Sequence, residues 1–354
     1  MVTSIMTINV LAWPKEKNRH QNPYNFLLYQ AMGEECRVSE FDGRKFRIDG
    51  ADILHMHWPK PLQDQRRWRM RWRCGRLLLA FDRLHAQGRK LVWTIHNLHP
   101  HKSMHSDLVE GFMQKLVAKT DGLIFHSADN RDEFLLAYPE AEKIPATVIP
   151  HMHYGNLYDI EDREQARRRW SIGKEEWVLG VFGKIRPHKG VETLVRLMEQ
   201  VLKQQSGKSW RLFLADSPGE TSISKELKYH LDSEPSTIHL LRHIEEQEIS
   251  SLFASFDVVI LPYEQILNSG TALLALSLGR PIVAPEIGSL PDLRNRFSNW
   301  VYLYPPPLTV EKLKQALEWV KARNRPDEKP DLSALEPAAV ARATEHFYRT
   351  VLQR

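Results

Sequence analysis

The chain contains 354 residues, of which 42% are hydrophobic, and its formal net charge is +5. Two cysteines, Cys36 and Cys74, are too few for a disulfide framework and favour a reducing compartment. The first residues lack the features of a signal peptide, and no apolar run reaches the roughly 18 residues of a transmembrane helix. We therefore expect a cytoplasmic protein with two domains of about 150–180 residues each.

Strand and helix patterns alternate along the first half of the chain. The strand-like runs are residues 7–13, 37–41, 52–58, 90–97, 122–127 and 146–151. The helix-like runs between them are residues 23–32, 66–87, 106–119 and 130–138. This alternation predicts a parallel, doubly wound sheet, which binds ligands at the carboxyl ends of its strands.

A second alternating series follows a charged connecting segment, residues 155–173. Its strand-like runs are residues 177–183, 210–215, 238–243, 256–263, 281–285 and 300–304, and its helix-like runs are 191–205, 246–253, 270–278 and 310–322. Residues 323–333 have the composition of a linker. We predict an α/β protein with two Rossmann-like domains facing a central cleft, residues 1–155 and 171–325. An amphipathic helix over residues 337–352 is able to pack back on the first.

Two loops of the second half have the features of a diphosphate site. The first, GKIRPHKG, follows a strand-like run and offers cations, and the second opens a helix, whose free N–H groups attract anions. We predict that they hold the diphosphate of a nucleotide-sugar with Gly183, Lys184, Arg186, Lys189, Gly190, Asn268, Ser269, Gly270 and Thr271. Ile244 and Tyr263 are candidates for holding the base and ribose. For GKIRPHKG, a charged surface turn is the alternative interpretation.

Histidines recur where the strand-like runs of the first half end, among them His55, His126 and His151. Imidazole can act as a general base near neutral pH, or it can hydrogen-bond sugar hydroxyls. The candidate bases are His57, His96 and His101, with Asp107 as a weaker one. A structural role is the alternative for each histidine. A His-x-His pair can also bind zinc, but no third ligand has a convincing spacing, so we expect no metal.

A basic segment, residues 60–76, carries seven lysines and arginines against one acid, Asp64, and therefore a net charge of +6. Tryptophans interleave with the arginines, which favours contact with an anionic membrane surface. The candidate contacts are Arg66, Arg67, Trp68, Arg69, Arg71, Trp72 and Arg73. The alternative is a solvated helix face with both tryptophans in the core. Nucleic-acid binding is a further alternative, but no known nucleic-acid motif accompanies the patch.

The chain resembles the bacterial β-mannosyltransferases of xanthan-type exopolysaccharide assembly. The matching segments run in order from residue 22 to residue 304 and include LHMHWPK, WTIHNLHPHK, GKIRPHKGVETL and LPYEQILNSGTALLALSLGRPIVAP. The resemblance implies a GT-B fold, a GDP-mannose donor, inversion at the anomeric carbon and no cofactor. It also implies a lipid-diphosphate-linked oligosaccharide acceptor and attachment to the cytoplasmic face of the inner membrane.

Two lysines depart from the family pattern, because Lys60 and Lys102 stand where relatives often carry an acid. Retaining GT-B families place two glutamates eight positions apart, and here Ile266 and Leu274 occupy the matching positions. The missing pair favours the xanthan-like group over the retaining families, and we expect an inverting, metal-independent transferase. A retaining or UDP-sugar-dependent transferase is one alternative, and a non-catalytic scaffold in a polysaccharide assembly complex is another.

Overall fold

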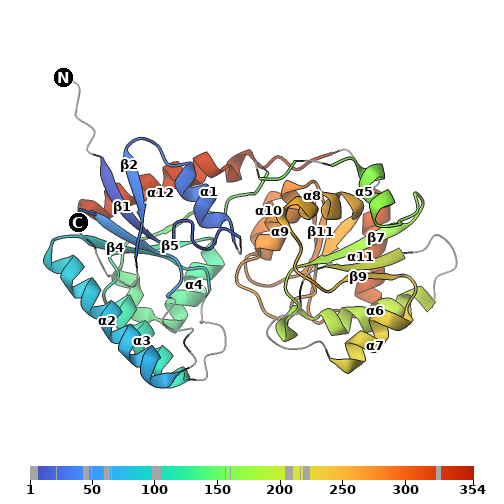
Figure 1. Ribbon diagram of the computed structural model, residues 1–354, viewed down its shortest axis with the longest axis horizontal. Helices are drawn as coiled ribbons and strands as arrows, with labels where there is room; N and C mark the ends of the chain where they lie inside the picture. Colours follow the sequence, from blue (N-terminus) through green and yellow to red (C-terminus); the bar gives the residue numbers. More distant parts are fainter. Residues whose placement is uncertain are drawn as a thin grey trace. The chain divides into compact units, whose positions relative to one another are not determined.

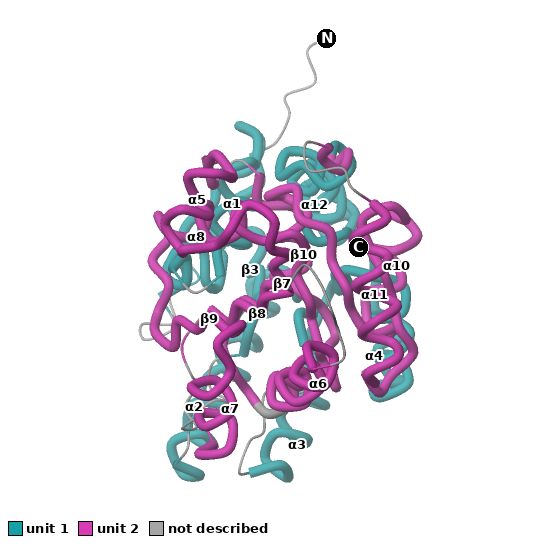
Figure 2. The backbone as a smooth tube through the Cα atoms, turned by 90° about the vertical axis from the view of Figure 1, so that its right-hand side faces the viewer, with its two compact units in different colours: residues 1–152, 333–354 teal, residues 153–332 magenta. Residues whose placement is uncertain are grey.

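The computed structural model divides into two compact units, shown in Figures 1 and 2. Unit 1 comprises residues 1–152 and 333–354, and unit 2 comprises residues 153–332. The structure describes residues 7–20, 22–42, 48, 50–59, 64, 66–97, 105–155, 157–159, 161–203, 210–215, 217, 224–323 and 328–354.

Unit 1 is built on a parallel six-stranded sheet with the order β2-β1-β3-β4-β5-β6. The strands are β1 (Ile8–Trp13), β2 (Cys36–Glu40), β3 (Ile53–Met56), β4 (Lys90–Thr94), β5 (Gly122–Phe125) and β6 (Ala146–Val148). The helices are α1 (Tyr24–Gln30), α2 (Arg67–Ala86), α3 (Ser106–Val117), α4 (Ala128–Ala137), the short 3₁₀ helix η2 (Pro139–Lys143) and, from the end of the chain, α12 (Pro337–Leu352). The strand order reverses between β1 and β3, so the ligand position expected for such a sheet lies at their carboxyl ends.

Helix α2 illustrates how the apolar pattern builds this core. Its buried residues recur at intervals of four and three positions, which forms one apolar stripe along the helix. They are Met70, Cys74, Leu77, Phe81 and Leu84, and Ala80 of the same helix is also buried. The tryptophans of α2 lie outside this stripe and are exposed.

Helix α12 completes unit 1 although it stands some 200 residues after β6 in the chain. It packs along α1 (Figure 1). The Glu345 carboxylate accepts a hydrogen bond from the Gly33 N–H at 2.7 Å. At Gly122 an added Cβ would lie 2.7 Å from Val351 Cγ2, so the absence of a side chain permits the close approach of α12.

Unit 2 repeats the architecture with the strand order β12-β11-β10-β7-β8-β9. The strands are β7 (Trp177–Phe182), β8 (Trp210–Ala215), β9 (Thr237–Leu240), β10 (Val258–Ile260), β11 (Ile282–Pro285) and β12 (Val301–Tyr304). The helices are α5 (Arg163–Arg169), α6 (Val191–Lys203), α7 (Lys225–Ser233), α8 (Glu246–Ser255), α9 (Gly270–Ser277), α10 (Leu290–Arg296) and α11 (Val310–Arg323), with short 3₁₀ helices η3 (Pro187–Lys189) and, in the chain after unit 2, η4 (Ser333–Leu335). The order reverses between β7 and β10, which places the expected ligand position at their carboxyl ends.

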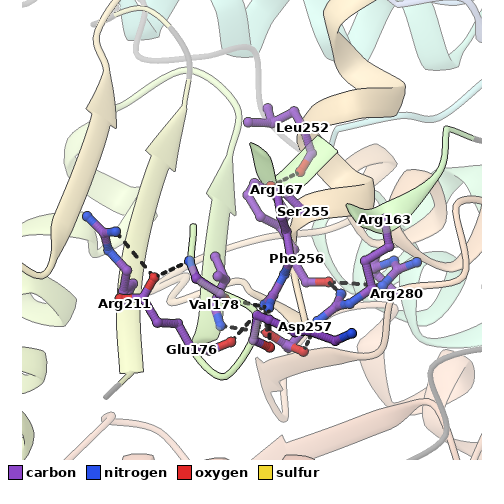
Figure 3. A network of polar contacts seen from close by, with 12 residues as sticks. Arg163, Arg167, Glu176, Val178, Arg211, Leu252, Ser255, Phe256, Asp257 and Arg280 are labelled. Carbon is purple, nitrogen blue, oxygen red and sulfur yellow. Dashed lines mark hydrogen bonds and ion pairs between the residues drawn. The ribbon is translucent and has the colours of Figure 1, made fainter. Parts of the chain in front are cut away.

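A charged network at the opposite ends of these strands ties α5 to the sheet (Figure 3). The Asp257 carboxylate accepts hydrogen bonds from the Val178 N–H at 2.7 Å and from Arg167 Nη2 at 2.8 Å, and it also pairs with Arg163. Arg167 is buried, with 5% of its surface exposed. Its charge therefore depends on Asp257 for compensation.

We expect Asp257→Ala to lower the free energy of unfolding by about 3–5 kcal/mol, because it leaves the buried Arg167 charge uncompensated. Asp232→Ala is the matched control. The Asp232 side chain is 55% exposed and lies 3.5 Å from His239, so we expect a loss below about 1 kcal/mol. Urea denaturation of both variants measures the difference, and equal losses would contradict this role of Asp257.

Three helices of unit 2, α5, α7 and α10, were not predicted from the sequence. Each has at most nine residues and buries few apolar side chains, so apolar periodicity does not detect it. Side-chain caps start two of them: Asp162 accepts from the Gln165 N–H and Ser224 from the Leu227 N–H. Among the helices that the structure describes, none is both long and apolar enough to span a bilayer.

Candidate functional site

The two loops predicted to bind a diphosphate lie side by side at the reversal point of the unit 2 sheet. One follows β7, the other follows β10 and leads into α9, and β7 and β10 are paired neighbours. Gly190 makes their close approach possible. Its φ is +62°, and an added Cβ would lie 2.0 Å from the Pro262 carbonyl oxygen, so a side chain has no room here.

Lys189 is the cation of these loops whose position is fixed by contacts with a neighbouring side chain. Its Nζ lies 3.1 Å from the Tyr263 hydroxyl and 4.3 Å from the centre of the Tyr263 ring. At Gly183, an added Cβ would lie 3.5 Å from Thr271 Oγ1 and 3.8 Å from Lys189 Nζ. The open space beside the Gly183 backbone is therefore bordered by the Lys189 ammonium and by the Thr271 hydroxyl.

Tyr263 links this cation to the start of α9. It is buried, and its hydroxyl lies 3.4 Å from Ser269 Oγ. Burial raises the pKa of Tyr263, but the Lys189 charge and hydrogen bonds with Ser269, Lys189 and Thr271 outweigh it, so the pKa lies below its ordinary value. A phenol under these influences stabilises the ammonium beside it.

The first turn of α9 adds backbone donors. Ser269 caps the helix by accepting the Ala272 N–H at 3.1 Å, which leaves the N–H groups of Gly270 and Thr271 without partners inside the helix. With Lys189 close by, this helix end can bind an anion.

The remaining predicted donor residues lie around this group. Lys184 is exposed and Arg186 is half-buried in the same loop. Asn268 directly precedes the cap of α9. Ile244 is buried ahead of α8, which begins with a capping box between Glu245 and Glu248.

Unit 1 gathers its strand-end histidines into one buried cluster. His57 Nδ1 lies 2.9 Å from His96 Nε2, and His96 Nδ1 lies 3.3 Å from His126 Nε2. His126 Nδ1 bonds the Ile149 carbonyl oxygen at 3.0 Å. Both ring nitrogens of His57 and His96 are thus engaged inside the cluster, and a substrate must displace one of these bonds to reach a nitrogen.

Three tyrosines, none of them predicted from the sequence as a site residue, extend the cluster. The Tyr29 hydroxyl lies 2.5 Å from His57 Nε2 and 2.9 Å from His55 Nδ1. The Tyr348 hydroxyl of α12 lies 2.6 Å from the same His55 nitrogen. The Tyr24 ring packs against His57, His96, His126 and His151. The aromatic spacing in YNFLLYQ was the available signal for α1, whereas nothing in the sequence around Tyr348 pointed to His55.

Burial keeps these imidazoles neutral. Desolvation lowers the pKa of His55 and His151 to about 3 and that of His126 to about 4. It also lowers the pKa of His57 and His96 well below the ordinary value, and neighbouring histidines add to the effect. At neutral pH the rings can therefore accept a proton only briefly or pass it on.

The other two candidate bases, His101 and Asp107, are not part of the described histidine cluster. His101 lies outside the residues that the structure describes. Asp107 lies in the first turn of α3 and forms a bidentate ion pair with Arg67 of α2. This pair lowers the pKa of Asp107 to about 2, which makes the carboxylate a weak base. Within the described part of the chain, no three His, Cys, Asp or Glu side chains are grouped to hold a metal ion.

Of the predicted membrane segment, residues 60–63 and 65, Lys60 among them, lie outside the described residues, and residues 67–76 form the first half of α2. Trp68 is 66% exposed and Trp72 is 57% exposed, so the alternative that places both in the core is wrong. The Arg69 guanidinium lies 5.3 Å from the centre of the Trp68 ring, and that of Arg76 lies 4.6 Å from the Trp72 ring. Arg66, Arg71 and Arg73 are also exposed on this helix end. The result is a surface that is both aromatic and cationic.

Comparison with known proteins gives matches over both units. Residues 176–321 match the family model for group 1 glycosyl transferases. A GDP-mannose:glycolipid 4-beta-D-mannosyltransferase of Xanthomonas campestris pv. campestris is 28% identical over 98% of this chain and 92% of its own length. A D-inositol 3-phosphate glycosyltransferase of Corynebacterium diphtheriae is 24% identical over 57% of this chain and 50% of its own.

Solved structures share the fold of the whole chain. Sucrose-phosphate synthase from Thermosynechococcus elongatus superposes with a TM-score of 0.70 at 15% identity, covering 98% of this chain and 99% of that one. Anabaena Alr3699/HepE, solved with UDP and glucose, gives a TM-score of 0.64 at 17% identity and covers 98% and 97%. These similarities confirm the predicted GT-B fold class.

Proposed function

We propose that this chain, a glycosyltransferase with the GT-B fold, transfers mannose from GDP-mannose to a glycolipid acceptor with inversion at the anomeric carbon. Its group 1 domain and its full-length similarity to a mannosyltransferase make it a glycosyltransferase. The observation that carries the donor and acceptor is the 28% identity over 98% of the chain to a GDP-mannose:glycolipid 4-beta-D-mannosyltransferase. We further propose that the acceptor is a lipid-diphosphate-linked oligosaccharide of exopolysaccharide assembly.

The geometry of unit 2 supports binding of the donor diphosphate. Lys189 and the first N–H groups of α9 offer positive charge where Gly183 leaves the backbone open. Charge accumulates on the diphosphate as the sugar–phosphate bond breaks, and preorganised cations and dipoles stabilise that charge. Lys189 and the N–H groups of α9 would thus stabilise the departing GDP.

The histidine cluster of unit 1 supports proton removal from the acceptor hydroxyl. Inverting transfer requires a base on the face of the sugar opposite the leaving group. No glutamate stands at Ile266 or Leu274, where retaining GT-B families carry their pair. His57, His96 and His126 are all buried, and we assign the contact with the acceptor to His96, the middle ring of the three.

The donor is tested by a thermal-shift panel of GDP, UDP, ADP and dTDP. A ligand that binds the native state raises the melting temperature, so we expect the largest shift with GDP. NMR of the product formed from GDP-mannose and a lipid-linked acceptor reports the anomeric configuration. A shift with UDP alone favours the UDP-sugar alternative, retention favours the retaining one, and the absence of any nucleotide binding favours the scaffold.

We also propose that the exposed half of α2 binds an anionic membrane surface, on the inner face of the plasma membrane. Arginines attract anionic headgroups, and tryptophans settle at the headgroup level. We expect Trp68→Ala with Trp72→Ala to weaken sedimentation with phosphatidylglycerol vesicles by at least about tenfold. Leu136→Ala is the control, since Leu136 is 83% exposed on α4 of the same unit. Equal binding of the two variants to these vesicles would contradict this role of α2, and so would wild-type protein that binds neutral vesicles as well as anionic ones.

A further inference from the structure

The hydrogen bonds of the histidine cluster run in a single direction. The Ile149 carbonyl oxygen can only accept, so His126 carries its proton on Nδ1. In a neutral ring Nε2 is then an acceptor, and the donor facing it is His96 Nδ1. The tautomer of each ring therefore follows from that of its neighbour.

The same reasoning applies to the remaining hydrogen bonds of the series, from His96 to His57 and Tyr29. With its proton on Nδ1, His96 accepts at Nε2 from His57 Nδ1, at 2.9 Å. His57 Nε2 in turn accepts from the Tyr29 hydroxyl, at 2.5 Å. His57, His96 and His126 are thus all Nδ1–H tautomers, and each hydrogen bond points toward Ile149.

We propose that His126 is the terminal proton acceptor of a relay that begins at His96. The inference rests on the proposed transferase function. The acceptor hydroxyl takes the place of His57 Nδ1–H at His96 Nε2. Its O–H bond breaks as an N–H bond forms at His96 Nε2, and the Nδ1 proton of His96 passes to His126 Nε2. The oxygen lone pair forms the bond to the sugar carbon, and the sugar–phosphate electron pair leaves with GDP.

The surroundings of His126 favour this direction. After transfer, the imidazolium of His126 still donates from Nδ1 to the Ile149 carbonyl, and this bond raises its pKa against the effect of burial. The pKa of His96, by contrast, is lowered well below its ordinary value. Among the described residues, the titratable groups around His126 are His57 after β3, His96 after β4, His151 after β6 and Tyr24 on α1. Their rings are neutral at pH 7, so of the linked rings His126, which bonds the Ile149 carbonyl, holds the transferred proton most readily, and burial limits this to a brief stage of the reaction.

The first test is His126→Gln, whose side-chain oxygen accepts the His96 hydrogen bond but cannot take up the proton. We expect kcat for mannosyl transfer to fall about 100-fold, with KM for GDP-mannose and the GDP thermal shift unchanged, and the acid limb of the kcat pH profile to change shape. His85→Gln is the control, since His85 bonds Asp121 ahead of β5, at the opposite end of the strand from His126, and should leave kcat within about twofold. A variant with the kcat and pH profile of the wild type overturns the relay and leaves the proposed function intact. A wild-type protein that transfers no sugar from any donor ends the proposed function and the relay with it.

The second test needs no variant and therefore does not depend on whether His126→Gln folds. Nitrogen-15 NMR of the histidine rings at pH 7.5 distinguishes Nδ1–H from Nε2–H tautomers. We expect Nδ1–H at His57, His96 and His126. An Nε2–H tautomer at His126 overturns the relay whatever the activity of the protein.

Discussion

Lys189→Ala is expected to lower kcat/KM for mannosyl transfer by about 10²–10³-fold, the usual loss for one preorganised charge-stabilising donor. The Lys189 ammonium lies 3.1 Å from the Tyr263 hydroxyl and close to both loops of the unit 2 site. If it neutralises the departing diphosphate, its stabilising effect is greatest in the transition state, and most of the loss appears in kcat.

Two further variants separate this role from a general effect of charge. Lys174→Ala removes the same charge from an exposed position of the same unit, where Lys174 pairs with Glu164, and should leave kcat/KM unchanged. Lys189→Arg keeps the charge but not the compact ammonium over the Tyr263 ring, so partial activity is expected. A Lys189→Ala protein within about threefold of the wild type would remove this lysine from the mechanism.

Unit 1 is expected to lose stability steeply as the pH falls below about 6.5. In the unfolded chain histidines have a pKa near 6.5, whereas burial lowers the pKa to about 3 for His55 and His151 and to about 4 for His126. Between these values the unfolded chain binds protons that the folded chain does not. The stabilisation is therefore complete above about pH 6.5 and is lost as the pH falls toward 4 for His126 and toward 3 for His55 and His151.

The size of this effect follows from proton linkage. Each of these histidines contributes a loss of about 1 kcal/mol between pH 6.5 and 5.5, so three together give about 3 kcal/mol. Urea unfolding followed at several pH values measures the slope. His151→Asn should reduce the slope of the unfolding free energy against pH by the amount that corresponds to about one bound proton. An unfolding free energy that stays constant from pH 7 to pH 5 would refute the prediction.

The fold was largely predictable because both sheets are parallel and buried. Their strands appear as short apolar runs between helical patterns, and the runs at residues 177–183 and 281–285 nearly coincide with β7 and β11. Strand lengths were less predictable: residues 256–263 yield only β10, Val258–Ile260. The residues after it are just as apolar, but they leave the ladder to form the loop that contacts Gly190.

The candidate site was predictable where its residues follow strands in sequence. GKIRPHKG and the start of α9 meet because β7 and β10 are neighbours, which the doubly wound topology implies. The contacts of the histidines were less accessible. Tyr348 reaches His55 across 293 positions of sequence, and no local pattern reports such a contact. Tyr263, a sequence candidate for holding the nucleotide base and ribose, contacts Lys189, and no local pattern predicted that contact.

The position of α12 has a consequence for how the protein is made. Unit 2 is one continuous stretch, residues 153–332, whereas unit 1 needs Glu345 and Tyr348 from the last helix. At about 5–20 residues per second, a ribosome needs roughly 10–40 s after residue 152 to deliver them. During that interval the nascent unit 1 presents the apolar surface that later receives α12, so the part synthesised first is the last to be completed.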